Sequence, residues 1–410
     1  RVLPELNLAC SGLSITGKKE EWTSLAADNP DLKIALGELY DQFKDAPTLG
    51  SLINPESSLK KDSLFELKWG EVNLLLEKAL SGEQDNDRSE MGVVAKGISK
   101  AANILADKYH LVITNVPYLV RGKQSEILQE FCEGHYKEGK KELATAFLSR
   151  CLEFCKNGGS TSIVLPQNWL FLTSYKKFRV KLLKNDNWHL IARLGPGAFE
   201  TISGEVVKAI LINLSRRKLI NESYDFKGRK DSSFDFLYGL DVSKENPASE
   251  KAKKLLTTKT MKVNQYEQLK NPDARVVFKK QKKGEKISLI ADCYQGLVTG
   301  DIERFTKKNW EVLKNNNIWI PFRRSNNTSH FFGDVSHVLL WEKGKGQLHS
   351  YAKLARNQLH DMHESGNRAW GRKGVAINRM QGLKAVPYYG EHFDNNVAVV
   401  FPFKDDELNP

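Results

Sequence analysis

The sequence predicts an α/β fold for the first half of the chain, because short apolar runs alternate with amphipathic stretches of helix length. His110–Thr114 is an apolar run that leads into a loop, as buried strands do. Glu142–Lys156 places Leu143, Phe147 and Cys151 on one helical face. With 410 residues the chain is long enough to fill more than one core. We therefore expect an α/β sheet with crossover connections, followed by a second domain.

The same alternation continues up to about residue 220. The helix that starts at Glu142 is expected to stop at Gly158 and Gly159, because glycine favours a helix end. Ser174 has the side chain of an N-cap and precedes a basic helix. The buried face of that helix is predicted to hold Tyr175, Phe178 and Leu182. The remaining apolar runs predict strands at Ser162–Leu165, His189–Leu194 and Val206–Leu214.

The composition of the chain changes twice, which divides it into three predicted parts. Residues 1–220 carry the pattern of strands and helices. Residues 221–286 are polar and rich in lysine with weak periodicity, as in a connector that holds a helix or two. Residues 287–410 combine short strands, aromatic residues and turn residues. We interpret this last part as a second, α+β domain.

The charge of the chain favours a polyanionic partner. Lysine and arginine number 62 against 50 aspartate and glutamate, a formal net charge of +12. Part of the excess lies in a lysine cluster between residues 279 and 286, for which a solvated loop is the competing interpretation. Five scattered cysteines indicate a reducing cytoplasm. No window reaches the roughly 18 consecutive apolar residues of a membrane helix, so no membrane partner is expected.

The most informative feature is Asn115-Val116-Pro117-Tyr118, which follows the predicted strand His110–Thr114. Ligands of open α/β sheets bind at the carboxyl ends of the strands. The Asn115 side chain and the Val116 carbonyl offer two acceptors to one planar amine, and Pro117 stiffens the turn that aims them. Tyr118 supplies a flat face on which a ring can stack. A turn that merely ends a strand is the competing interpretation, because such four-residue strings are common in loops.

Several segments, taken in order, resemble the gamma-type N6-adenine DNA methyltransferases, in the branch of Eco57I-like enzymes and BREX phage-defence methylases. The Asn-Pro-Pro-Tyr motif of that family corresponds to Asn115, Val116, Pro117 and Tyr118. Its Asp-Leu-x-x-x-Phe helix is similar to Glu142–Phe147. The later matching segments are Ser162–Pro166, Asn168–Phe171, Tyr175–Leu183, Ala198–Phe199, Val206–Leu214 and Gln295–Gly300, the last of which resembles the opening of a target recognition domain.

The resemblance implies a fold, a reaction and a site. It implies a Rossmann-like class I methyltransferase sheet in residues 1–220, present only in part, and an incomplete target-recognition domain in residues 287–410. S-adenosyl-L-methionine would be the methyl donor, and N6 of an adenine flipped out of double-stranded DNA would be the acceptor. Asn115 and the Val116 carbonyl would hold N6, Tyr118 would stack on the base, and Phe199 would form the opposite wall. A core aromatic between strands is the equal alternative for Phe199.

The chain departs from the family pattern in three ways. Val116 replaces the first proline of the motif, which a contact made by a backbone carbonyl tolerates. Glu142 replaces an aspartate and has a longer arm. No Gly-x-Gly cofactor loop precedes Asn115, and Ala9–Gly12 resembles only the tail of one. We expect this loop to lie upstream of Arg1, so the cofactor-binding residues are unknown.

The second predicted domain interleaves basic and aromatic residues, a mixture that suits contacts with a nucleic acid backbone and stacking on bases. Arg372 and Lys373 are the candidate substrate-binding residues. They lie near Trp370, Arg379, Tyr388 and Tyr389. A surface loop with an aromatic core of its own is the equal alternative.

Other candidate sites are weaker. Cys151 and Cys155 lie on an apolar helical face, where packing explains them. His349, His360 and His363 have a spacing similar to that of metal ligands, but no cysteine or acidic pair accompanies them, so no metal is expected. The turn at Gly195–Gly197 is interpreted as the end of a strand rather than as a phosphate cradle.

The function predicted from the sequence is methyl transfer to adenine N6 in a specific DNA sequence, in restriction–modification or phage defence. Other subunits of such a defence system are possible partners. One alternative is a truncated fragment that binds DNA without catalysis. Another is a methyltransferase that acts on RNA or on a glutamine side chain of a protein, because the Asn-x-Pro-Tyr pocket suits any planar amine or amide.

Overall fold

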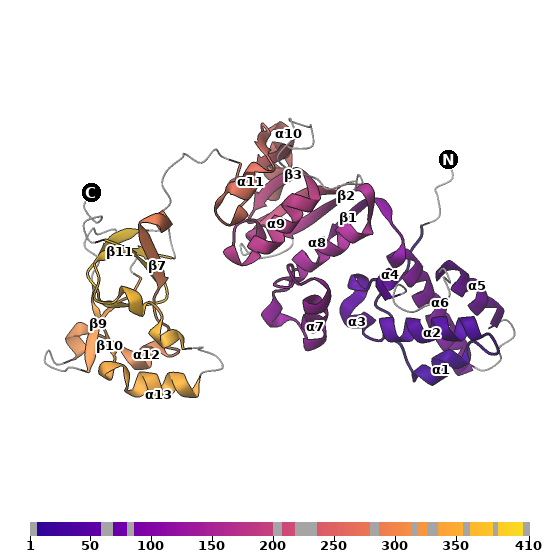
Figure 1. Cartoon of the computed structure of the whole chain (residues 1–410), viewed down its shortest axis with the longest axis horizontal. Coiled ribbons are helices and arrows are strands. Elements are labelled where there is room, and N and C mark those ends of the chain that lie inside the picture. The colour runs from indigo at the N-terminus through magenta and orange to yellow at the C-terminus, as the bar shows by residue number, and fades with distance from the viewer. Residues whose placement is uncertain are drawn as a thin grey trace. The chain divides into compact units, whose positions relative to one another are not determined.

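The structure is a computed structural model of the chain. It describes residues 6–58, 69–79, 86–199, 207–217, 236–278, 287–312, 318–325, 335–355, 361–379 and 384–404. The chain divides into two compact units, Arg1–Lys280 and Gln281–Pro410 (Figure 1). No helix among the described residues is long and apolar enough to cross a membrane.

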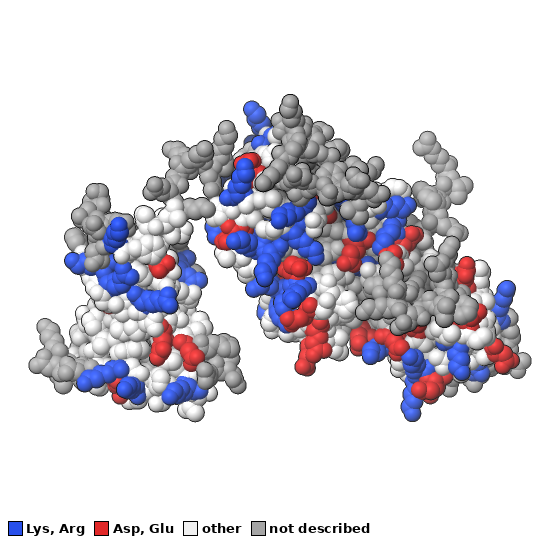
Figure 2. Space-filling view, in the orientation of Figure 1, with Lys and Arg blue, Asp and Glu red and all other residues white. Residues whose placement is uncertain are grey.

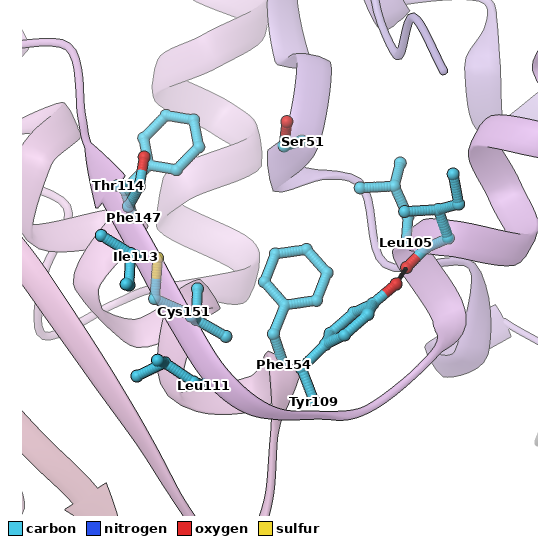
Figure 3. A pocket seen from close by; sticks show the side chains of 11 residues that line it. Ser51, Leu105, Tyr109, Leu111, Ile113, Thr114, Phe147, Cys151 and Phe154 are labelled. Carbon is cyan, nitrogen blue, oxygen red and sulfur yellow. Dashed lines mark hydrogen bonds between the residues drawn. The ribbon is translucent and has the colours of Figure 1, made fainter. Parts of the chain in front are cut away.

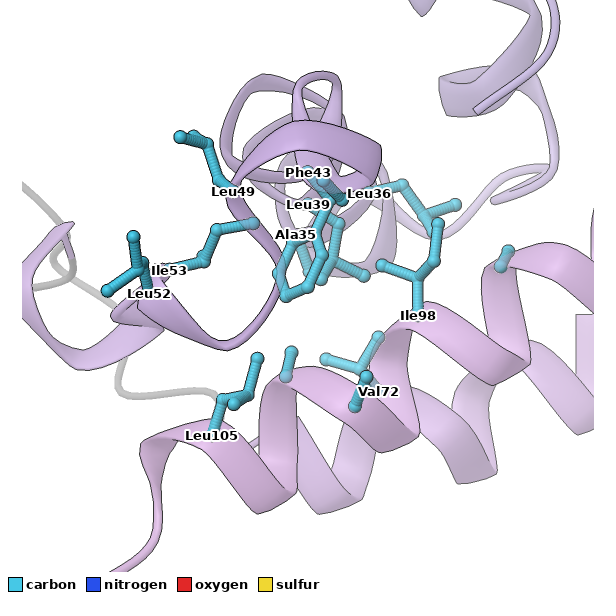
Figure 4. Packing of buried hydrophobic residues seen from close by; sticks show 14 of the residues in the cluster. Ala35, Leu36, Leu39, Phe43, Leu49, Leu52, Ile53, Val72, Ile98 and Leu105 are labelled. Carbon is cyan, nitrogen blue, oxygen red and sulfur yellow. The ribbon is translucent and has the colours of Figure 1, made fainter. Parts of the chain in front are cut away.

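The first unit opens with a layer of helices. Its members are α1 (Lys19–Ser24), α2 (Pro30–Phe43), α3 (Ala46–Leu49), α4 (Pro55–Ser58), α5 (Trp69–Ala79) and α6 (Asn86–Ala106). Asn29 caps α2, because its side-chain oxygen accepts from the backbone N–H groups of Asp31 and Leu32. Leu36 and Leu39 of α2 belong to one buried apolar cluster with Val72 of α5 and Ile98 of α6 (Figure 4). Burial of these faces holds the short helices together.

A six-stranded mixed sheet follows. Its strands are β1 (Tyr109–Asn115), β2 (Cys155–Pro166), β3 (Asp186–Gly195), β4 (Ala209–Arg216), β5 (Phe236–Asp241) and β6 (Met261–Asn264), in the spatial order β1-β2-β4-β3-β5-β6. Strands β1, β2, β3 and β5 run in one direction, and β4 and β6 run against them. The predicted α/β fold is therefore confirmed as a mixed sheet.

The helices that follow β1 are α7 (Glu126–His135), α8 (Leu143–Phe154) and α9 (Lys176–Asn185). The predicted helix at 142–156 is α8, but it ends at Phe154 because Cys155 is already extended. Gly158 and Gly159 lie within β2 instead of capping the helix. A side chain at position 159 would approach the carbonyl oxygen of Tyr109 to 2.7 Å, so the pairing of β1 with β2 requires this glycine.

The basic helix predicted after Ser174 is α9. Its predicted buried face is confirmed, since Tyr175, Phe178 and Leu182 are all buried. The predicted N-cap is wrong, because Ser174 lies inside a 3-10 turn and Tyr175 precedes the first helical residue. The last predicted strand is β4, which begins at Ala209; Val206 lies outside the described residues.

The structure differs from the expected connector at 221–286. Residues 236–278 add β5, α10 (Ala248–Thr257), β6 and α11 (Glu267–Lys270) to the first unit. The buried side chain of Gln265 holds this addition, because it donates to the carbonyls of Leu183 and Asp186 and accepts from the Trp188 N–H. The sequence does not predict β5 and β6, because two short strands at a sheet edge that are held by the Gln265 amide produce no clear hydrophobic period. The lysine cluster at 279–286 lies outside the described residues.

A buried arginine joins α8 to the helical layer. The Arg150 guanidinium donates to the backbone carbonyls of Ser51, Ile53 and Leu105, at 3.2, 2.7 and 2.7 Å. It also lies 3.9 Å from the centre of the Phe154 ring. Buried carbonyls need such donors, so Arg150 links the segments that carry the site to the helices α3–α6.

A second buried charge predicts a pH dependence of stability. Burial raises the pKa of Asp186 from 3.8 to about 7, although Arg216 and Arg217 oppose the shift. The folded protein therefore holds this proton more tightly than the unfolded chain, and stability is lost as the pH rises from about 4 to about 7. Between pH 5 and 8 we expect a loss of about 2–3 kcal/mol that Asp186→Asn removes. Urea unfolding at both pH values measures it, and Asp28→Asn, at an exposed position, should leave the loss unchanged.

The second unit is built from short strands and short helices, as expected for an α+β domain. One four-stranded sheet has the order β12-β11-β14-β7, and the other has the order β13-β9-β10-β8. The strands are β7 (Ala291–Gln295), β8 (Thr306–Lys308), β9 (Trp319–Arg323), β10 (His337–Leu340), β11 (Gly374–Asn378), β12 (Ala385–Tyr388), β13 (His392–Phe393) and β14 (Val397–Pro402). Its α-helices are α12 (Ile302–Phe305) and α13 (Gln347–Leu354).

Candidate functional site

The candidate site lies at one edge of the first sheet. Because β1, β2, β3 and β5 are parallel, their carboxyl ends share this edge. These ends are Asn115, Pro166, Gly195 and Asp241. The sequence motif at Asn115 therefore begins where ligands of α/β sheets bind.

The four motif residues divide into an anchor and an exposed surface. Val116 is buried in the core beneath the sheet edge, whereas Asn115 and Pro117 are exposed. The loop is also tied to the segment before α8, because the Leu143 N–H donates to the Leu119 carbonyl at 2.9 Å. The Arg121 backbone N–H also donates to the Lys141 backbone carbonyl, at 3.0 Å. The Asn115 side chain thus faces solvent from a fixed backbone.

Tyr118 lies half-buried against the same core. Its hydroxyl is buried and has no hydrogen-bond partner among the described residues. Burial, and next to it the charge of Glu142, raise the pKa of Tyr118 to about 12. Burial also raises the pKa of Glu142, which is 8% exposed. The motif therefore lies next to poorly solvated groups, one of which is the Glu142 carboxyl. In the sequence, Glu142 stands out only as a departure from the aspartate of the family pattern, because its burial depends on tertiary packing.

Phe199 lies at the same edge, beyond the end of β3. It packs in a small apolar cluster with Leu194, Ala209 and Val242, whereas Tyr118 packs in the larger core. Three strand spacings of about 4.8 Å, roughly 14 Å, separate β1 from β3. Phe199 is thus partly a core aromatic, and its role as the wall facing Tyr118 stays a prediction.

A cavity of about 350 Å³ runs beside β1 and reaches Thr114, the residue before Asn115 (Figure 3). Its lining includes Leu105 from α6, Ile113 from β1, and Phe147 and Phe154 from α8. None of the residues that line this cavity is acidic. The sequence does not predict this cavity, because its walls are formed together by helices that precede β1 and helices that follow it.

These surroundings do not form a site for S-adenosylmethionine by themselves. The described elements before β1 are all helical, so no strand leads into a glycine turn there. Ala9–Gly12 follows irregular backbone rather than a strand. The lining of the cavity is mostly apolar, with polar groups at Ser51, Tyr109 and Thr114, and it includes no carboxylate for the hydroxyl groups of a ribose. No residue of the chain is therefore assigned to the cofactor.

Comparison with protein families finds a match within the first unit. Residues 16–199, a little less than half of the chain, match the model of the Eco57I restriction-modification methylase family. The matched region runs from before α1 to Phe199, and it includes the site motif and the cavity.

Two curated adenine-specific methyltransferases are similar to this chain. The adenine-specific methyltransferase PglX of Lacticaseibacillus casei (strain Zhang) is 23% identical over 75% of this chain and 26% of its own length. The adenine-specific methyltransferase BrxX of Escherichia coli O9:H4 (strain HS) is 25% identical over 94% of this chain and 31% of its own length. The chain thus spans about a quarter to a third of these relatives.

Among solved structures, the DNA complex of the Type IIL restriction-modification enzyme MmeI is similar to this chain. It is 12% identical with a TM-score of 0.44, and the match covers 82% of this chain and 55% of that one.

The candidate residues of the second unit have different surroundings. The Arg372 guanidinium donates to the Pro402 carbonyl at 2.7 Å and lies 4.1 Å from the centre of the Phe401 ring. The predicted DNA contact at Arg372 would therefore compete with two contacts inside the unit. Lys373 is exposed. Nearby, Tyr389 and Arg379 are exposed, Tyr388 is buried, and Trp370 stacks on His392 with ring centres 3.8 Å apart.

Proposed function

We propose that the chain forms part of an S-adenosyl-L-methionine-dependent methyltransferase that modifies N6 of adenine in a specific DNA sequence. The modification would serve restriction–modification or phage defence. The observation that carries the proposal is the exposed Asn115 at the carboxyl end of β1, held by a buried Val116 within the region that matches the Eco57I methylase family model. The names of both curated relatives support adenine as the substrate.

The motif acts on the amine of the base. The Asn115 carbonyl oxygen and the Val116 backbone carbonyl accept the two N6 protons, which directs the nitrogen lone pair out of the base plane. The donor supplies an electrophilic methyl group when it is bound. The donor would release this methyl group to N6 and keep the electron pair of the broken sulfur–methyl bond. Positive charge develops on N6 and is lost when the proton leaves, so the motif needs no strong base.

The floor of the site predicts a contrast between two variants of Tyr118. The ring stacks on the base, whereas the hydroxyl is buried without a protein partner. Tyr118→Phe should therefore retain stability and methyl transfer, because it removes an unsatisfied polar group. Tyr118→Ala should reduce turnover by about 5- to 150-fold, since one stacked base is worth about 1–3 kcal/mol. Single-turnover kinetics and thermal unfolding of both variants measure these effects. An equal loss of turnover in both variants would contradict the proposal that the Tyr118 ring stacks on the base.

We propose roles for the three parts along with this function. Residues 1–220 belong to the catalytic domain, to which the segment 236–278 contributes two strands, and residues 287–410 belong to the target-recognition domain. The exposed Lys373 is the better remaining candidate for a DNA contact in that domain. In the first unit, Lys and Arg gather over the region of α9 and α11 (Figure 2). Four exposed lysines of α9 suit phosphate contacts: Lys176, Lys177, Lys181 and Lys184.

One experiment separates the proposal from its alternatives. The protein to be assayed is a longer polypeptide that contains this chain and is as long as the curated relatives. It is incubated with unmethylated duplex DNA, RNA and cell protein, together with labelled S-adenosylmethionine. Label at N6 of adenine in DNA is the expected result. Label that enters only RNA or a protein glutamine would contradict DNA as the substrate. DNA binding without any label would favour a non-catalytic DNA-binding protein, and defence-system subunits can then be added to the same assay.

A further inference from the structure

A cluster of potential metal ligands lies in the second unit, and it includes two of the histidines considered in the sequence analysis. His349 projects from α13, and His363 and Glu364 belong to the 3-10 turn η10 (Met362–Glu364). The Nδ1 atom of His349 lies 3.1 Å from Nε2 of His363, and Oε1 of Glu364 lies 3.8 Å from the same Nε2. The three ligand atoms all lie within 4.8 Å of one another.

Hydrogen bonding alone explains this arrangement poorly. His363 is 3% exposed, and its Nδ1 atom is buried without a partner among the described residues. Its other nitrogen, Nε2, faces the imidazole of His349 and the carboxylate of Glu364. The buried ring thus turns its Nε2 atom toward two further potential ligand atoms.

The two segments that carry the ligands are held in place independently. Leu348 and Ala352 anchor α13 by their burial, and Tyr351 of the same helix packs on Phe305 with ring centres 5.3 Å apart. The Val298 N–H donates to the Met362 carbonyl at 3.0 Å, which fixes η10. A metal ion would therefore meet ligands already close to their bound positions.

We propose that His349, His363 and Glu364 bind a zinc ion, with water at the fourth position. Zinc–nitrogen bonds of about 2.0–2.1 Å at a tetrahedral angle place two ligand atoms about 3.3 Å apart, close to the observed 3.1 Å. Two imidazoles beside one carboxylate suit zinc, whereas magnesium and calcium prefer oxygen ligands alone. The ion would clamp α13 to η10. From the sequence no metal is expected, because no cysteine or acidic pair accompanies these histidines; His360 lies outside the described residues.

The test uses the whole chain, freed of any purification tag and dialysed against a chelator. Titration calorimetry with zinc chloride should show one site per chain with a Kd of about 10 μM or tighter, and zinc should raise Tm. His349→Gln and Glu364→Gln should each weaken binding at least tenfold, because each removes one ligand. His110→Gln, at an exposed position in the first unit, should bind zinc as the unaltered chain does.

Cobalt provides a second readout. Cobalt(II) in the same site should give the visible absorption of a four-coordinate complex, and His349→Gln should abolish it. The proposal fails if zinc binds only at millimolar concentration, or if the two ligand variants bind zinc as tightly as the unaltered chain. Circular dichroism of each variant without metal shows whether a loss of binding reflects the lost ligand or a lost fold.

Discussion

Asn115→Ala is expected to abolish methyl transfer to adenine while affinity for duplex DNA changes by less than about twofold. The side chain is exposed at the end of β1, so its loss leaves no buried group without a partner. Contacts with phosphates dominate DNA affinity, and Asn115 makes none in the proposed site. Loss of a preorganised contact with the reacting group reduces turnover by about 10²–10³-fold or more.

The measurement needs two assays on the same protein at full length. Single-turnover methylation of an adenine-containing duplex gives the rate, and fluorescence anisotropy with the same duplex gives the Kd at a stated salt concentration. Asn103→Ala, at an exposed position on α6, is the matched control and should leave both values unchanged. Turnover within a few-fold of normal in the Asn115 variant would show that the motif does not hold the amine.

Arg150→Leu is expected to lower the free energy of unfolding of the first unit by about 3–5 kcal/mol. The substitution leaves the buried carbonyls of Ile53 and Leu105 and the partly buried carbonyl of Ser51 without their donor. It also removes the contact of the guanidinium with Phe154. The carbonyls belong to segments about 45 to 100 residues away from Arg150 in the sequence, so the loss should separate the helical layer from α8.

Urea unfolding followed by tryptophan fluorescence measures this effect. Arg121→Ala is the matched control, because the ion pair of Arg121 with Glu133 is partly exposed and is worth about 1 kcal/mol or less. Hydrogen exchange should also become faster in α6 before it does in β2. A change below about 1 kcal/mol in the Arg150 variant would mean that apolar packing alone holds the helical layer on α8.

The motif and the elements around it could be predicted from the sequence because their signals are local. The apolar run of β1, the helical period of α8 and the strands β2, β3 and β4 depend on neighbouring residues, and so does the position of Asn115 after a strand. The order of these elements also carried the resemblance to the methylase family. Local signals failed to predict where helices begin and end, as at Ser174 and at Gly158, because tertiary pairing determines these boundaries.

The parallel alignment that brings the ends of β1, β2 and β3 to one edge was decided by tertiary structure. So were the addition of β5 and β6 to the sheet, the contacts of Arg150 and of Arg372, and the approach of His349 to His363. Each joins segments that are distant in the sequence and that have no shared period. Partners of this kind are selected by burial and by the need of buried polar groups for hydrogen bonds, which exist only after the chain has folded.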